Sequence, residues 1–391
     1  MRVYLDNAAT TPLDQEVFEA MVPYMLTHFG NPSSIHSHGR DVRSAIEKSR
    51  KKIADLLNSS PSEIFFTSGG TEADNTAIRC TIESHNITHV ISSEIEHHAV
   101  LHTLQNLEKS GRINLSYVAL DIKGNLDLDH LQHLLRQEKR SFVSLMHGNN
   151  EIGNITDIEK IGELCAETGA IFHSDTVQTF GHYRHDLQQL KVHSIVGAAH
   201  KFHGPKGIGL LYINNSLKIN PFIHGGSQER NMRGGTENVY GIVGLAKALE
   251  IAYTNMEEHT AQIQNLKKYM IEQLEEKMPG VDFHGDSSNP ERSLYTVLNV
   301  CLPPSEDHDM LLFNLDINKI SASGGSACSS GTNIGSHVLS SIKADPDRGA
   351  VRFSFSKFNT KEEIDYTVDK LVQILGIKNQ EKPQDSIHDL R

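Results

Sequence analysis

Short apolar segments alternate with amphipathic stretches through the first half of the chain. The apolar segments have the length of strands and cover residues 64–67, 88–92, 114–120, 142–146, 170–173, 193–196 and 209–213. Stretches with helical spacing separate most of them, at residues 71–84, 99–110, 128–137 and 155–168. Strands that alternate with helices form βαβ units, whose right-handed crossovers give parallel strands. We therefore predict an α/β fold with a mostly parallel seven-stranded sheet wrapped by helices.

The pattern changes on both sides of this region. Two helices are predicted before it, at residues 12–24 and 40–57, and a long helical stretch follows it at residues 238–277, before Pro279 and Gly280. β-Prone segments at residues 294–301, 319–322 and 351–355 then indicate a smaller α+β domain. We predict a large domain of residues 13–255 and a small domain made of residues 1–12 and 256–391, with a frayed polar end after residue 378.

Composition narrows the class of protein. The 391 residues include 37 Lys and Arg against 49 Asp and Glu, a formal net charge of −12. Such a balance disfavours a broad surface that follows nucleic-acid phosphates. The chain has no basic-apolar leader and no apolar run that could span a bilayer, so we expect a cytoplasmic protein without membrane contact.

The four cysteines are scattered, without a CxxC or a Cys/His pair at zinc spacing, so neither a metal site nor a disulfide framework is predicted. Cys80, Cys165 and Cys301 lie in apolar or helical contexts and are expected to be small buried hydrophobic residues. Cys328 lies in a Gly- and Ser-rich segment, residues 321–332, which predicts an accessible thiol on a loop.

A lysine with catalytic potential occurs in the segment 198–207, between two predicted strands. A turn at this place can desolvate the amine of Lys201, lower its pKa and leave free base that forms a Schiff base with a carbonyl. An ordinary surface lysine is the alternative.

Two further segments end predicted strands and carry candidate ligand-binding groups. Gly70 and Thr71 open a helix after the strand at residues 64–67, and such a helix start binds phosphate through free amides, although a simple helix cap has the same pattern. Asp175 ends another strand, at the sheet edge where open α/β folds bind ligands. It is a candidate partner for a protonated pyridine nitrogen, with helix capping as the alternative.

A set of motifs in unbroken order, from Val3 to Tyr366, closely resembles the cysteine desulfurases of the NifS/IscS branch of class V aminotransferases. The motifs are residues 4–11, 30–34, 96–97, 149–153, 200–201, 233–236 and 326–328. The resemblance implies the fold of type I pyridoxal-phosphate-dependent transferases and a homodimer. It also implies that pyridoxal 5'-phosphate is the cofactor.

Carried over by position, the resemblance assigns the cofactor-binding residues. Lys201 would attach the cofactor covalently and then move the proton of the substrate Cα. Asp175 would pair with the pyridine nitrogen, His97 would stack on the ring and take part in acid–base steps, and Gln178 would donate to the phenolic oxygen. The phosphate would be held by Gly70, Thr71, His200 and, from the neighbouring subunit, Thr236. The alternatives are a helix-capping His97 and a Thr236 that only forms a turn.

The resemblance also implies the substrate chemistry. The substrate carboxylate would be bound by Arg352, whose forked guanidinium suits this task, and by Asn150, which would also border the cofactor. The alternative for Arg352 is a structural ion pair. Cys328 would take the sulfur as a persulfide, on a loop that resembles the longer form of the iron–sulfur-assembly branch. The function implied is conversion of L-cysteine to L-alanine, with sulfur delivered to an acceptor such as an iron–sulfur scaffold protein or to another thio-transfer pathway.

Two positions depart from the family pattern. Ala198 stands where a phosphate-binding serine is usual, which predicts weaker cofactor retention, and Ser227 stands where a third glycine is common. Two other functions remain open at this point. One is a selenocysteine lyase, since the same electron sink serves a selenium leaving group, and the other is a scaffold without pyridoxal phosphate.

Overall fold

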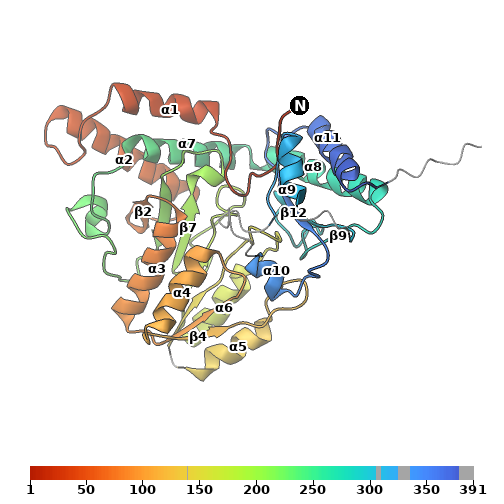
Figure 1. Cartoon of the computed structure of the whole chain (residues 1–391). Coiled ribbons are helices and arrows are strands. Elements are labelled where there is room, and N and C mark those ends of the chain that lie inside the picture. The colour runs from red at the N-terminus through yellow and green to blue at the C-terminus, as the bar shows by residue number, and fades with distance from the viewer. Residues whose placement is uncertain (139, 305–309, 325–334, 378–391) are drawn as a thin grey trace, which may run out of the picture.

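A computed structural model of the chain describes residues 1–138, 140–304, 310–324 and 335–377. Figure 1 shows a large body of helices around a sheet, beside a smaller body that contains the N-terminal strand and the C-terminal helix α11. The helices of the large body are α1 (Gln15–Leu26), α2 (Ser37–Leu56), α3 (Gly70–His85), α4 (His98–Lys109), α5 (Leu128–Gln137), α6 (Ile158–Thr168) and α7 (Val239–Thr254).

The large sheet contains seven strands in the order β2-β8-β7-β6-β5-β3-β4. They are β2 (Ile64–Thr67), β3 (His89–Ser92), β4 (Asn114–Tyr117), β5 (Ser141–Ser144), β6 (Ile171–Asp175), β7 (Ser194–Ala198) and β8 (Gly209–Ile213). All neighbouring pairs are parallel except those of β8, which runs antiparallel to both β2 and β7. The predicted fold class is confirmed, and the short turn between β7 and β8 explains the exception, because a parallel crossover needs a dozen or more residues.

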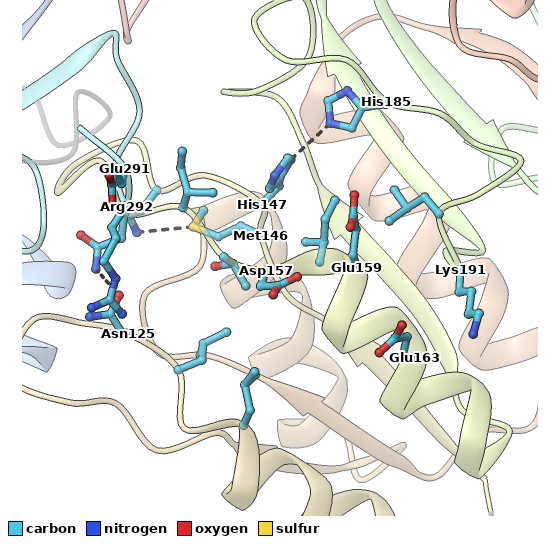
Figure 2. Close-up of a pocket in the computed structure, with 18 of the residues that line it drawn as sticks. Asn125, Met146, His147, Asp157, Glu159, Glu163, His185, Lys191, Glu291 and Arg292 are labelled. Atoms are coloured by element: carbon cyan, nitrogen blue, oxygen red, sulfur yellow. Dashed lines mark hydrogen bonds between the residues drawn. The ribbon is translucent and has the colours of Figure 1, made fainter. Parts of the chain in front are cut away.

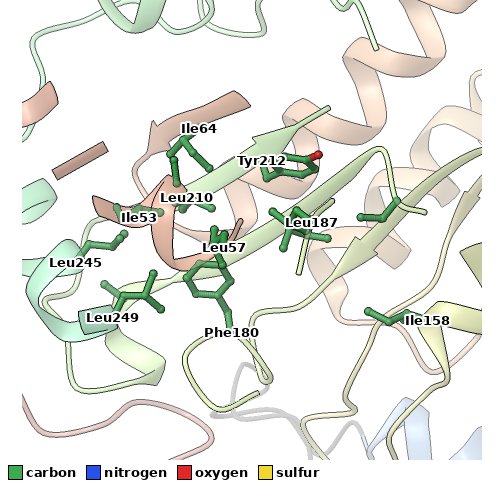
Figure 3. Packing of buried hydrophobic residues seen from close by; sticks show 14 of the residues in the cluster. Ile53, Leu57, Ile64, Ile158, Phe180, Leu187, Leu210, Tyr212, Leu245 and Leu249 are labelled. Carbon is green, nitrogen blue, oxygen red and sulfur yellow. The ribbon is translucent and has the colours of Figure 1, made fainter. Parts of the chain in front are cut away.

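Alternation of side chains along the strands creates two apolar layers. On β8, Leu210 and Tyr212 belong to the buried cluster that also contains residues of α2 and α7, whereas Leu211 and Ile213 face the cluster of α3 and α4. Figure 3 shows the first cluster, where Ile53 of α2 and Leu57, the residue that follows this helix, approach the strands. A strand covered on both faces reads as a continuous apolar run.

The smaller body has its own buried cluster, which combines Val3 and Leu5 with residues between 263 and 372. Its elements are β1 (Val3–Tyr4), α8 (Met256–Lys277), β9 (Asp282–Phe283), β10 (Val297–Cys301), α9 (Leu311–Ile317), β11 (Ile320–Ser321), α10 (His337–Ser341), β12 (Ala350–Ser354) and α11 (Lys361–Ile374). β1 pairs with β11, and β10 pairs with β9 and β12. The prediction of one helical stretch over residues 238–277 was wrong in detail, because α7 and α8 are separate helices that meet at Asn255.

Candidate active site

A cavity of about 240 Å³ lies at the carboxyl ends of β6 and β7. Nine residues predicted from the sequence line it together, namely Gly70, Thr71, His97, Asn150, Asp175, Gln178, His200, Lys201 and Arg352. Thr236 does not line this cavity and is exposed in the single chain, and Cys328 lies outside the described residues. The parallel arrangement of β5, β6 and β7 explains the gathering, because parallel strands end at the same edge.

Lys201 is held in a short 3-10 turn, Ala199–Lys201, directly after β7. Its Nζ donates to the carbonyl oxygens of Ala8 at 2.6 Å and Ala9 at 3.0 Å. His200 reaches the same N-terminal segment, with Nδ1 3.2 Å from Oγ1 of Thr10. The N-terminal segment therefore forms one wall of the cavity, and Lys201 is a partly buried residue of that cavity.

Asp175 is the last residue of β6, and only 5% of it is exposed. Burial raises the pKa of its carboxyl group, while the backbone N–H of Val177 at 2.9 Å and the charge of Lys201 act in the opposite direction. The carboxylate thus holds the turn after the strand, as the capping alternative states, and also lines the cavity.

Two further buried carboxyl groups lie beside Asp175, and the sequence analysis missed both. Asp74 lines the cavity, and its Oδ1 lies 3.5 Å from Nε2 of His173. Glu96 accepts the backbone N–H of Met146 at 2.9 Å. Burial first, and then the neighbouring carboxylates, raise the pKa of Asp74 well above its ordinary value, and burial does the same for Glu96. The helical spacing from Gly70 to Asp74, one turn, is the only sequence signal that could have identified Asp74.

His97 caps a helix, as the alternative reading of its position predicts, and it also lines the cavity. The helix is α4, and Nδ1 of His97 accepts the backbone N–H of Ala99 at 3.2 Å. Burial, followed by the charge of Lys201, lowers the pKa of His97 to about 4. The ring is therefore neutral near pH 7, and because Nδ1 accepts the N–H of Ala99, its hydrogen is on Nε2.

His337 also lines the cavity, although no pattern in the sequence singles it out. It is the first residue of α10, and its Nδ1 lies 3.2 Å from Nε2 of His98. Its own Nε2 lies 2.9 Å from the carbonyl oxygen of Glu96. This histidine pair links α10 of the smaller body to the start of α4.

The start of α3 fits an anionic group. Its N-cap residue is Gly69, which has no side chain that could cap the amides of the first turn. A Cβ on Gly70 would lie 2.8 Å from Cγ2 of Val177, so a larger residue here would force the Val177 side chain to move. Gly70 and Thr71, whose backbone N–H groups belong to the first turn and have no partner within the helix, line the cavity, and so does Ala198, which is 2% exposed. Ser227 has φ −81°, so the absence of a glycine there causes no backbone strain.

Arg352 of β12 is 1% exposed and forms both an ion pair and part of the cavity wall. Its Nη2 lies 2.7 Å from Oδ1 of Asp6, and its Nη1 donates to the carbonyl oxygen of Asn150 at 2.9 Å. Gln178 donates to the carbonyl oxygen of Ala8 at 3.0 Å. The cavity thus presents a buried guanidinium, a lysine, a carboxyl group and a helix start, which together suit a ligand with several charged groups.

A larger cavity, of about 700 Å³, lies beside the first one and contains none of the predicted site residues. Figure 2 shows its wall, where His147 and His185 point toward each other, with Nδ1 and Nε2 3.2 Å apart, above Asp157 and Glu159. Met146 lines both cavities. The chemistry-bearing residues gather in the smaller cavity, so size is a poor guide to the active site here.

The described residues contain neither a candidate metal site nor a helix that could span a membrane. No group of three or more His, Cys, Asp or Glu side chains among them is arranged to hold a metal ion. No helix among them combines the length and the apolar character that crossing a membrane requires.

Comparison with known proteins agrees with this geometry. The family described as aminotransferase class-V matches residues 3–367. The chain is 44% identical over 377 residues to the cysteine desulfurase IscS of Dictyoglomus turgidum, which covers 95% of this chain and 94% of that protein. It is 42% identical over 377 residues to the cysteine desulfurase IscS of Methanosarcina thermophila, with 95% and 92% covered.

Solved structures give the same result. A NifS-like protein superposes with a TM-score of 0.89 at 37% identity, over 97% of this chain and all of that one. The apo structure of a cysteine desulfurase from Thermococcus onnurineus superposes with a TM-score of 0.85 at 26% identity, over 96% and 95% of the two chains. The resemblance inferred from the ordered motifs is confirmed.

Proposed function

This chain belongs to the class-V aminotransferase family, and we propose that it is a pyridoxal-phosphate-dependent cysteine desulfurase that converts L-cysteine to L-alanine. The observation that carries the proposal is the single cavity that contains Lys201, a buried Asp175 and the uncapped start of α3. The names of the relatives, cysteine desulfurase IscS, support the choice of substrate.

The residues present fit the cofactor from end to end. The amides of Gly70 and Thr71, with His200, would hold the phosphate, and Asp175 would keep the pyridine nitrogen protonated. Lys201 supplies the amine for covalent attachment, His97 offers a neutral ring for stacking, and Gln178 would donate to the phenolic oxygen. When bound, pyridoxal phosphate supplies an electron sink for the bonds of the substrate Cα.

The remaining steps belong to side chains of the protein. Arg352 and Asn150 bind the substrate carboxylate, and the Lys201 amine moves the proton of the substrate Cα. His97 lies in the same cavity and would take part in the acid–base steps. The Cys328 thiolate attacks the substrate sulfur, so an S–S bond forms as the C–S bond breaks. The bonding electron pair stays with the substrate Cβ, which takes up a proton, and a proton returns to Cα, which leaves L-alanine and a Cys328 persulfide.

The proposal also includes a sulfur acceptor, a homodimer and a cellular location. The persulfide passes its sulfur to an acceptor protein, such as an iron–sulfur scaffold. Thr236, which is exposed in the single chain, would complete the phosphate site of a second copy in a homodimer. The cytoplasmic location and the two-domain division at residues 12/13 and 255/256 stay predictions.

The test is release of alanine and sulfide from L-cysteine by the purified protein, after the visible absorbance of the cofactor has been recorded. Lys201→Ala is expected to abolish both the covalent absorbance and the activity. Lys206→Ala, an exposed lysine of the same segment outside the cavity, is the matched control and is expected to retain both. A protein that stays colourless after cofactor addition would exclude the proposal.

Cys328→Ser separates the desulfurase from a selenocysteine lyase. It is expected to abolish alanine release from cysteine, because the substrate sulfur then lacks its acceptor thiol. A variant that retains full activity on both cysteine and selenocysteine would contradict a role for Cys328 and favour the lyase.

A further inference from the structure

Asp6 lies where three parts of the chain meet. It follows β1, and its backbone bridges to Ser354 at the end of β12. Its Oδ1 accepts from Nη2 of Arg352 at 2.7 Å and from Oγ of Ser323 at 2.8 Å. Ser323 in turn pairs with Arg352 through the backbone, with an Arg352 N to Ser323 O distance of 2.6 Å. One carboxylate oxygen therefore joins the N-terminal segment, β12 and the chain that follows β11.

The guanidinium of Arg352 is fixed by only two hydrogen bonds among the described residues. Asp6 holds Nη2, and the carbonyl oxygen of Asn150 holds Nη1. The buried Nε has no partner in this part of the chain. A guanidinium has five N–H groups in a rigid plane, so these two bonds determine the direction in which the remaining N–H groups point.

Charge makes Asp6 the more important of the two partners. Arg352 is 1% exposed, so its positive charge has lost nearly all of its water, and the Asp6 carboxylate is the negative group in direct contact with it. The carbonyl of Asn150 accepts a hydrogen bond but carries no net charge. Without Asp6, the guanidinium would have to turn towards another acceptor or towards water.

We propose that Asp6 is a positioning residue that orients Arg352 for the carboxylate of the substrate. This rests on the proposed function, in which Arg352 binds that carboxylate. Asp6 itself does not line the cavity, so it acts through Arg352. The inference gives a role to the aspartate of the N-terminal motif, for which the sequence offered none.

The experiment measures ligand binding to the cofactor-loaded protein. L-Alanine carries the carboxylate and has no sulfur to lose, whereas ethylamine has only the amine. Titration of each ligand is followed by the change in cofactor absorbance. Asp6→Asn is expected to raise the dissociation constant of alanine about 10- to 100-fold, the range for a lost hydrogen bond to a charged group, and to leave that of ethylamine within about twofold.

Asp14→Asn is the matched control. Asp14 lies in the same N-terminal segment and forms a comparable ion pair, 2.5 Å from Nζ of Lys357, but it does not line the cavity or touch Arg352. Asparagine keeps its helix-capping role at α1. This variant is expected to bind both ligands like the wild type. Asp6→Glu keeps the charge but moves the oxygen, and an intermediate loss of alanine binding is expected, which gives a second test if Asp6→Asn does not fold.

The outcomes separate the two proposals. If Arg352→Lys weakens alanine binding and neither Asp6 variant does, the positioning role is overturned while the proposed function stands. If Asp6→Asn weakens alanine and ethylamine equally, its effect is only structural and the role is again overturned. If the wild type binds alanine as a ligand but forms no alanine from L-cysteine, the desulfurase proposal fails. The comparison of alanine binding with ethylamine binding still tests the role of Asp6. The kinetic expectation is a raised KM for cysteine with a smaller change in kcat.

Discussion

Ala198→Ser tests the proposed phosphate-binding end of the cavity most directly. Ala198 ends β7, is 2% exposed and lines the cavity near Gly70. A serine there adds one hydroxyl at a position that the desulfurase family uses for the phosphate. We expect the variant to bind pyridoxal phosphate more tightly than the wild type.

The hydrogen bonds of the new hydroxyl determine the expected changes in cofactor affinity and in stability. A hydroxyl that donates to a charged phosphate contributes about 1.5–3 kcal/mol, and each 1.4 kcal/mol is tenfold in affinity. The cofactor dissociation constant should thus fall about 10- to 100-fold. The same hydroxyl without cofactor is buried and short of a partner, which costs about 1–3 kcal/mol. The cofactor-free variant should therefore unfold at a lower temperature than the cofactor-free wild type.

Equilibrium dialysis with cofactor absorbance as the readout measures the affinity, because the chain has no Trp whose fluorescence could report binding. Thermal unfolding of the cofactor-free protein measures the loss of stability caused by the unpaired hydroxyl. Ala198→Cys is the control, since a thiol is of similar size but a weak donor. Equal cofactor affinities for the serine variant, the cysteine variant and the wild type would refute the reasoning. So would a cofactor-free serine variant that is more stable than the wild type.

Two further predictions concern buried charges. Arg50 is 2% exposed and pairs with the buried Glu229 at 2.7 Å, so Glu229→Gln removes its buried counter-charge and should lower the free energy of unfolding, measured in urea, by about 3–5 kcal/mol. The control is Glu47→Gln, which removes a half-exposed partner of the same arginine and should lower the free energy of unfolding by less than about 1 kcal/mol. Equal losses for the two variants would contradict the argument. Burial lowers the pKa of Lys267 from 10.5 to about 7. Between these pH values the unfolded state binds one proton more than the folded state, so the free energy of unfolding of the wild type should rise with pH, by roughly 3 kcal/mol from pH 7 to pH 10. Lys267→Met should remove that rise, and an unchanged pH profile of unfolding would show that the amine is charged in the folded protein.

Much of the fold can be predicted from the sequence because it depends on local pattern. A strand buried on both faces needs a continuous apolar run, and a helix between two such strands leads to parallel pairing. The antiparallel β8 follows from the short turn that contains Lys201. The break at Asn255 could not be predicted, because the helical pattern continues on both sides of it.

The same division applies to the site. The sequence by itself identified the strand ends, the helix start at Gly70 and the lysine turn that line the cavity, since these are local features. Only the tertiary structure decided which other groups surround them. Asp6 meets Arg352 across 346 residues of chain, and His337 meets His98 across 239. Burial and ion pairing are set by such long-range contacts, which leave no periodic mark in either segment.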